Sequence, residues 1–139
     1  MIKYFSLLFL FFFINLPNLL ASQDKDNSLI VEADNSIEYF ENEKYYLASG
    51  NAVVKKKNTT LKANVIKAFF KSNDQIKLIQ GIGNVSLVNK NILAKGEHVK
   101  YDLKNQTILF SKGSQSFKSS GIYIESNEFL SYDNLKKRA

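Results

Sequence analysis

The stretch that decides the fold is Leu47-Ala48-Ser49-Gly50-Asn51-Ala52-Val53-Val54. On both sides of the central Gly-Asn pair, apolar residues alternate with polar or small ones. Period-two alternation with β-branched residues predicts a half-buried strand. A glycine inside a strand pattern predicts a bulge or a sharp bend. The stretch therefore predicts two strand segments that meet at a kink at Gly50.

A repeat with a period near 30 residues runs through the chain from Leu29 onward. Each unit has a strand pattern that ends in an aromatic residue, a turn, and a strand pattern interrupted by a glycine and a polar residue. One such unit per repeat favours a solenoid-like stack of strands. The alternative is a Greek-key sandwich whose hairpins look alike by chance. The aromatic residues are Tyr39, Phe69, Tyr101 and Tyr132, and the kinks are Gly50-Asn51, Gly83-Asn84 and Gly113-Ser114.

No part of the chain after residue 28 carries a helical stripe of apolar residues. The one proline, Pro17, lies before this region, so no strand ladder needs to be interrupted there. These patterns predict an all-β fold of about ten to twelve short strands.

The N-terminus has the organisation of a secretory signal peptide. Lys3 precedes the apolar run Tyr4–Ile14, and Ala21 offers a small residue for cleavage. The run has 11 residues, whereas a membrane-spanning helix needs roughly 20. An uncleaved anchor that continues through Leu20 is the alternative. The predicted organisation is a signal peptide at 1–21, a flexible lead-in at 22–28, one β-domain at 29–133 and a basic tail at 134–139.

Composition excludes several classes of site. The 139 residues contain no cysteine and a single histidine, His98, so we expect no disulfide, no cysteine-bound zinc or iron–sulfur centre and no metal site. Glu97 and His98 point to opposite faces of a strand, and no nucleophile accompanies them, so we expect no catalytic residue and no cofactor. The net charge is +6, but the basic residues are dispersed, unlike a nucleic-acid interface.

Strand alternation gathers apolar side chains on one face of the predicted sheet. A continuous apolar face can line a lipid-binding groove, or it can be an ordinary dry core. A lysine run before Asn58 can meet phosphates at a rim, or it can be a solvated turn. The candidate lining residues are Leu29, Val31, Ile37, Tyr39, Tyr46, Ala52, Val54, Leu61, Val99, Tyr101 and Leu103, and the candidate rim residues are Lys55, Lys56 and Lys57.

The ordered motifs resemble the OstA/LptA family. Val31-Glu32-Ala33-Asp34 is similar to its "I-x-A-D" pattern, Gly50–Val54 to "G-N-V-x-V", and Leu61–Asn64 to "A-D-x-V". The second pattern returns at Gly81–Val85, and Val99–Asp102 belongs to a further repeat. Each motif alone is weak, but their recurrence covers the chain from Leu29 to Asp133. Two positions depart from the pattern, since Asn64 replaces an aspartate and Ser114 replaces an asparagine.

The resemblance implies a twisted β-jellyroll, open along one side, whose apolar interior holds the acyl chains of lipid A. It also implies a periplasmic bridge for lipopolysaccharide transport between an inner-membrane LptC-like protein and an outer-membrane LptD-like protein. An uncleaved anchor would favour an LptC-like component instead. Two further classes of function are compatible with the strand pattern: an envelope adaptor domain without lipid, and a periplasmic enzyme or sugar-binding jellyroll.

The two ends of the repeat region show no cap. The repeat begins at Leu29–Ala33 and stops at Asn127–Tyr132, without a proline or helix that would cover the outer strands. Uncapped strand edges accept further strands. Because the two ends differ, we expect copies of the chain to assemble head to tail. The alternative is that the lead-in Ser22–Ser28 and the basic tail cover both edges.

Overall fold

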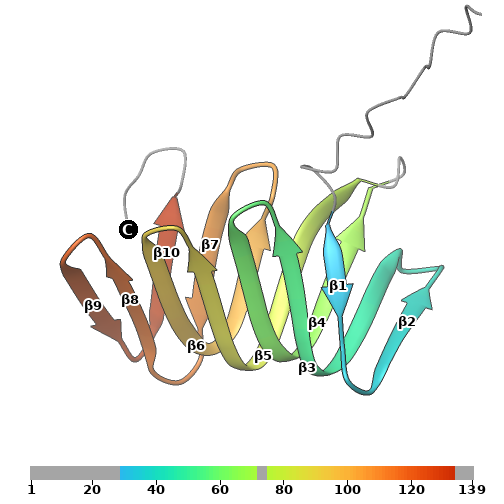
Figure 1. Ribbon diagram of the computed structural model, residues 1–139, viewed down its shortest axis with the longest axis horizontal. Helices are drawn as coiled ribbons and strands as arrows, with labels where there is room; N and C mark the ends of the chain where they lie inside the picture. The colour runs from blue at the N-terminus through green and yellow to red at the C-terminus, as the bar shows by residue number, and fades with distance from the viewer. Residues whose placement is uncertain (1–28, 72–74, 134–139) are drawn as a thin grey trace, which may run out of the picture.

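The computed structural model describes residues 29–71 and 75–133, which form one ten-stranded antiparallel sheet (Figure 1). The predicted signal peptide, lead-in and basic tail lie outside the described residues. Within the described part, no helix has the length and apolarity needed to cross a membrane. The strands are β1 (Ile30–Glu32), β2 (Ser36–Phe40), β3 (Tyr45–Lys56), β4 (Thr59–Phe70), β5 (Ile76–Asn89), β6 (Ile92–Asp102), β7 (Thr107–Ser111), β8 (Gln115–Ser119), β9 (Ile122–Ser126) and β10 (Phe129–Asp133).

The four central strands, β3 to β6, are long and bent. The ten strands agree with the predicted number, but these four have 12, 12, 14 and 11 residues and are therefore longer than the short strands that were expected. The bends lie inside continuous strands, because a bulge turns the chain and the pairing resumes beyond it. The ladders shift register between Ser49 and Ala52, between Lys62 and Val65, and between Ile82 and Val85.

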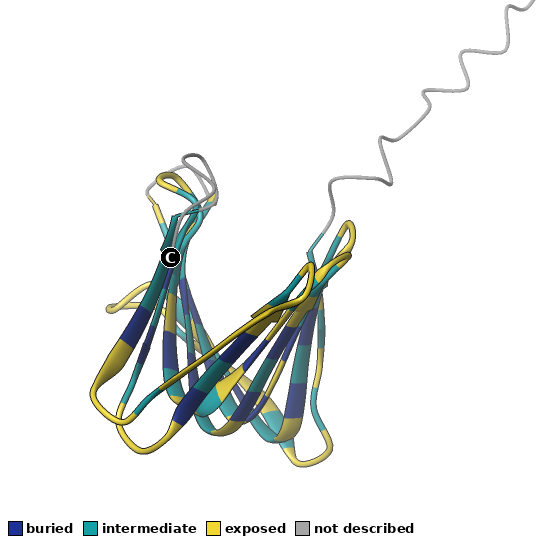
Figure 2. Ribbon diagram, turned by 90° about the vertical axis from the view of Figure 1, so that its left-hand side faces the viewer, coloured by how far each residue is buried: buried dark blue, intermediate teal, exposed yellow. Residues whose placement is uncertain are grey.

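The bends fold the sheet into a V with two arms (Figure 2). The first arm, called the β1 arm, contains β1, β8 and β9 together with segments 52–56, 59–63, 85–89 and 92–96 of the central strands. The second, called the β2 arm, contains β2, β7 and β10 together with segments 45–49, 65–70, 76–82 and 98–102.

The Gly-Asn pairs turn the strands at the base of the V. Gly50 and Asn51 have φ of 81° and 44°, and the corresponding pair at Gly83 has 77° and 49°. Glycine adopts this left-handed region at little cost, and asparagine tolerates it better than most residues. Asn51 Nδ2 donates a hydrogen bond of 2.9 Å to Asp34 Oδ2 on the neighbouring bend. The predicted kinks at Gly50 and Gly83 are therefore present.

Small side chains let the two arms meet at the base of the V. Ala52 and Ala63 are paired across β3 and β4, and both are buried. A Cβ on Gly81 would lie 2.9 Å from Val99 Cγ1 and 3.4 Å from the Ala63 side chain. Larger residues such as Leu61 and Leu87 follow along the arm. The core therefore fills the base of the V and leaves space toward its mouth.

Candidate functional site

Two adjoining cavities lie between the arms. One has a volume of about 320 Å³ and the other about 840 Å³. They share Leu29, Lys56 and Leu103, so together they form one groove, called the central groove below. The smaller cavity is lined by Leu29, Val54, Lys56, Lys57, Asn58, Thr59, Leu61, Ile79, Asn89, Tyr101, Leu103 and Gln106, and the larger by Leu29, Val31, Ile37, Tyr46, Lys56, Phe70, Lys71, Gln75, Ile76, Leu103 and Lys104.

Most of the candidate lining residues come together in this groove. Ala52 and Val99 are instead buried at 0% and 2% exposure in the core cluster below it. Tyr39 lies beside Tyr46, with ring centroids 4.6 Å apart, and lines neither cavity. The eight candidates that line a cavity are Leu29, Val31, Ile37, Tyr46, Val54, Leu61, Tyr101 and Leu103.

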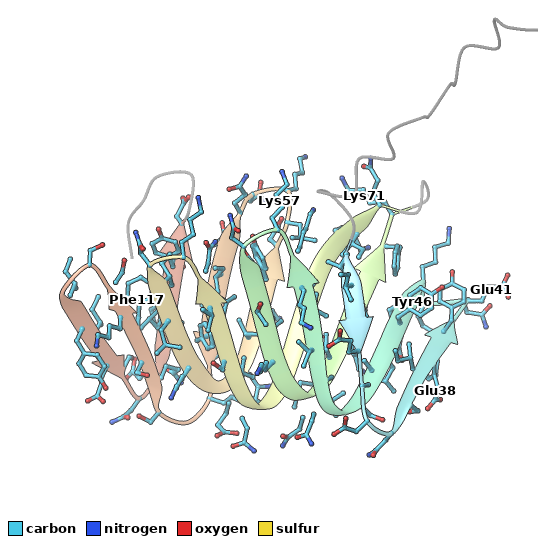
Figure 3. The ribbon with its side chains drawn as sticks, viewed as in Figure 1. Glu38, Glu41, Tyr46, Lys57, Lys71 and Phe117 are labelled. Carbon is cyan, nitrogen blue, oxygen red and sulfur yellow. The ribbon has the colours of Figure 1, made fainter. Side chains whose placement is uncertain are left out.

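The groove is open at the end formed by β1 and β2. Ile37, Tyr39 and Tyr46 are 49%, 50% and 39% exposed, although they occupy the inner face of the β2 arm. Tyr46 also meets the Phe70 ring edge-on, with centroids 5.3 Å apart. Figure 3 shows Tyr46 at this end of the molecule. An apolar chain can therefore contact these side chains without displacing the packed core.

The three lysines predicted at the rim do not act together. Lys56 and Lys57 line the groove, and Lys57 lies at the upper rim in Figure 3. Lys55 points to the outer face, where its Nζ lies 2.9 Å from Glu32 Oε2. The difference follows from strand geometry, because neighbouring residues on a strand face opposite sides. Lys55 is therefore separated from the groove by the sheet itself.

Two further lysines on the β2 arm line the groove opposite Lys56. Lys71 follows β4 and Lys104 follows β6, and neither was predicted from the sequence. Within residues 29–71 and 75–133, none of these three lysines forms a salt bridge, although the charge of Lys104 lowers the pKa of the Asp102 carboxyl. The mouth of the groove therefore carries positive charge from both arms, available to an anion.

Phe70, Ile76 and Ile79 are further lining residues that sequence reasoning missed. Ile79 is the register partner of Tyr101, so knowing how β5 pairs with β6 would have identified Ile79 as a lining residue. The ordinary pKa of a tyrosine hydroxyl, about 10, keeps Tyr101 neutral at physiological pH, and burial raises the pKa of this hydroxyl further. The interior of the groove therefore presents uncharged side chains, and its charge is confined to the rim.

The fold and the groove place this chain in the class of open-sided β-jellyrolls with an apolar interior. Residues 30–134 match the family described as LptA/(LptD N-terminal domain) LPS transport protein, where LPS is lipopolysaccharide. The chain belongs to this family, as its Gly-Asn repeats predicted. No curated protein sequence matches the chain significantly.

A solved structure with a similar fold is LptH from Pseudomonas aeruginosa, described as the LptA homologous periplasmic component of the conserved lipopolysaccharide transport device. The TM-score is 0.73 at 19% sequence identity, and the match covers 83% of this chain and 82% of that chain. The predicted all-β jellyroll is therefore confirmed.

Proposed function

We propose that the chain holds the acyl chains of lipopolysaccharide in the central groove and carries this lipid across the periplasm, without catalysing a reaction. The observation that carries the proposal is the groove itself, which is apolar inside, lysine-bearing at its mouth and open at the β1–β2 end. Each buried methylene contributes roughly 0.8 kcal/mol. A few methylenes per acyl chain are therefore enough to offset part of the entropy cost of binding.

The lysines orient the lipid more than they hold it. Lys56 of the β1 arm and Lys71 and Lys104 of the β2 arm line the larger cavity, which supports a role for them in meeting the phosphates of lipid A. Charges at an exposed rim are screened beyond about 8 Å at physiological salt. We therefore assign most of the lipid affinity to apolar burial, and we assign the orientation of the headgroup to the lysines.

The proposed route places the chain between two membranes. A signal peptide at 1–21 directs it to the periplasm, an inner-membrane LptC-like protein delivers lipid, and an outer-membrane LptD-like protein receives it. Copies of the chain join head to tail between them. The β1–β2 and β9–β10 ends support this assignment, since each presents an edge strand with exposed apolar residues such as Ile30 and Ile122.

Photocrosslinking tests the lipid-binding site directly. A photoreactive amino acid at position 101 or 103 should label lipopolysaccharide in intact cells, because both side chains line the groove. The matched control is position 100, which is exposed on the outer face of the same strand. Equal labelling at the three positions would contradict the assignment of the groove as the lipid site.

A further inference from the structure

The two ends of the central groove differ. Two rows of inner side chains run along it, one on each arm. On the β1 arm, Leu61, Leu87, Ala94 and Phe117 follow one another as register partners. On the β2 arm the corresponding row is Ile79, Tyr101, Ile108 and Tyr132. Near Leu61 and Tyr101 these rows enclose a cavity. The same rows meet each other at Phe117 and Tyr132.

The Phe117–Tyr132 contact closes the groove toward β9 and β10. The ring centroids lie 5.2 Å apart with planes tilted by 31°, within the range of a favourable aromatic pair. Phe117 is only 5% exposed, and Ile108 beside the pair is 6% exposed. At several positions the Cα atoms of β8 and β10 approach within 8 Å, although these strands belong to opposite arms. Neither cavity includes a residue of β7 to β10.

The apolar inner face continues beyond this contact. Ile124 is the register partner of Phe117 on the next strand and faces the same side of the sheet. It is 38% exposed, and Ile122 on the same face is 59% exposed. A groove that simply ended at Phe117 would need no apolar residues beyond. Exposed apolar side chains on an edge strand are instead typical of a surface that contacts a ligand or a partner.

We propose that Phe117 and Tyr132 form a gate, which lipid in the central groove must open to reach the inner face of β9. This inference rests on the proposed function, because it assumes that lipid occupies the groove. Tyr132 is the movable half, since it is half-buried on β10, which pairs only with β7 among the described strands. Phe117 is held from both sides, because β8 pairs with β6 and β9. Figure 3 shows Phe117 at the end of the molecule opposite Tyr46.

The gate is tested by locking it in a reversible way. The chain contains no cysteine, so F117C/Y132C introduces the only two thiols. A bis-methanethiosulfonate reagent with a short spacer then joins the thiols where the two rings met, and a reductant removes the spacer. A photoreactive amino acid is placed at position 103, inside the groove, or at position 124, beyond the gate. Purified lipid A is the probe, and unbound lipid is removed before illumination.

In the locked protein we expect lipid A to label position 103 and to leave position 124 at background. After reduction of the same sample, label at position 124 should appear at a level comparable to that at position 103. The matched control is K95C/S116C, which joins β6 to β8 on the outer face without spanning the groove. This control lock should leave label at position 124 unchanged.

Three outcomes are decisive. Label at position 124 in the locked protein, equal to that after reduction, would overturn the gate while leaving the lipid site intact. Absence of label at position 103 in every state would overturn the proposed function and the gate with it. If the double variant does not fold, Tyr132→Leu in the otherwise unchanged chain should speed the appearance of label at position 124 several-fold. An unchanged rate would also overturn the gate.

Discussion

Gly83 lies at the bend of β5, and Gly121 lies in the turn between β8 and β9. Comparing the two glycines tests how much the bend of β5 depends on glycine. Both have left-handed φ, 77° and 84°, but a Cβ on Gly83 would lie 2.6 Å from Asn64 Nδ2, whereas nothing lies within 4 Å at Gly121. Left-handed backbone costs an L-residue about 1 kcal/mol. We expect Gly121→Ala to lower the free energy of unfolding by about that amount. Gly83→Ala should cost about 2–3 kcal/mol, because it also displaces a hydrogen-bonded side chain.

Urea denaturation of the two alanine variants measures this difference. Gly121→Ala is the control, because it carries the backbone strain without the steric contact. Equal losses in the two variants would mean that the Asn64 side chain moves aside freely and does not brace the bend.

Asn64 departs from the family pattern, and the structure gives the departure a physical meaning. Asn84 Nδ2 donates to Asn64 Oδ1 over 3.4 Å, whereas the equivalent Asn51 donates to the carboxylate of Asp34 over 2.9 Å. Hydrogen bonds to charged acceptors are shorter and stronger. Asn64→Asp should therefore stabilise the protein by a few tenths to about 1 kcal/mol.

The reverse change, Asp34→Asn, serves as the control for Asn64→Asp and should destabilise by a similar amount. Thermal unfolding of both variants checks the pair. A loss of stability in Asn64→Asp would show that the extra negative charge outweighs the improved hydrogen bond.

At the level of strands, alternation predicts the inner face across a bend only where the bend keeps the phase of the buried residues. On β3 the buried residues keep one phase across the kink, from Ala48 to Ala52 and Val54. On β4 the phase changes, from Leu61 and Ala63 to Ile66 and Ala68. The sequence marks the bend of β3 with a glycine but leaves that of β4 unmarked.

Because of this change of phase, extending the alternation from Ala63 along β4 points to the wrong residues beyond the bend. Phe70 was missed as a lining residue for this reason. The closed end of the groove could not be predicted either. It depends on Phe117 meeting Tyr132 across the arms, and that contact is set by tertiary packing rather than by local pattern.

The turn between β6 and β7 supplies a pH-dependent element. Asp102 Oδ1 accepts hydrogen bonds from the backbone N–H groups of Asn105 and Lys104, each at 2.9 Å. The Asn105 N–H first, and Lys104 also, lower the pKa of this carboxyl. The pKa of Asp102 is therefore lower in the folded state than in the unfolded state. The ionised carboxylate stabilises the fold at pH values above the unfolded-state pKa. This contribution is lost as the pH falls through the folded pKa.

We therefore expect Asp102→Ala to cost at most about 1 kcal/mol at neutral pH, since the exposed site is screened by solvent. The difference from the wild type should shrink as the pH falls below the ordinary aspartate pKa of about 4 and through the lower pKa of Asp102 in the folded state. Urea denaturation at several pH values measures it. If the stability lost in Asp102→Ala stayed constant down to the lowest pH measured, the turn would not depend on the negative charge of Asp102.

Across the whole molecule, lipid affinity should depend more on the groove wall than on the rim. I37D/L103D places two carboxylates in the apolar cavity and should abolish lipid binding, because an unpaired charge is costly to bury. K56Q/K104Q should weaken binding several-fold at low salt and less at high salt. Lys55→Gln is the matched control, since Lys55 lies outside the groove, and it should have no effect.

Titration with fluorescent lipopolysaccharide at two salt concentrations distinguishes these contributions. The ordering would be wrong if the paired lysine variant lost all binding while the paired aspartate variant retained it. If Lys55→Gln lowered lipid affinity as much as K56Q/K104Q does, the overall charge of the protein, rather than the rim lysines, would attract the lipid.

The asymmetric ends of the V decide how copies can join. Ile30 and Tyr39, both 50% exposed, belong to the edge strands β1 and β2, and Ile122 and Phe129, at 59% and 61%, belong to β9 and β10. If unlike ends meet, as proposed, each copy can add another, so we expect the assembly to grow with concentration. I30K/Y39K should block one end and I122K/F129K the other, because a lysine on an edge opposes strand addition.

Sedimentation velocity of the two blocked variants separates head-to-tail from symmetric contact. Each variant alone should remain monomeric, because every contact needs one end of each kind. An equimolar mixture should form dimers and stop there, since the intact β1–β2 end of one variant meets the intact β9–β10 end of the other. A symmetric contact between like ends would instead let each variant dimerise alone through its intact end. Head-to-tail contact therefore predicts that dimers appear only on mixing.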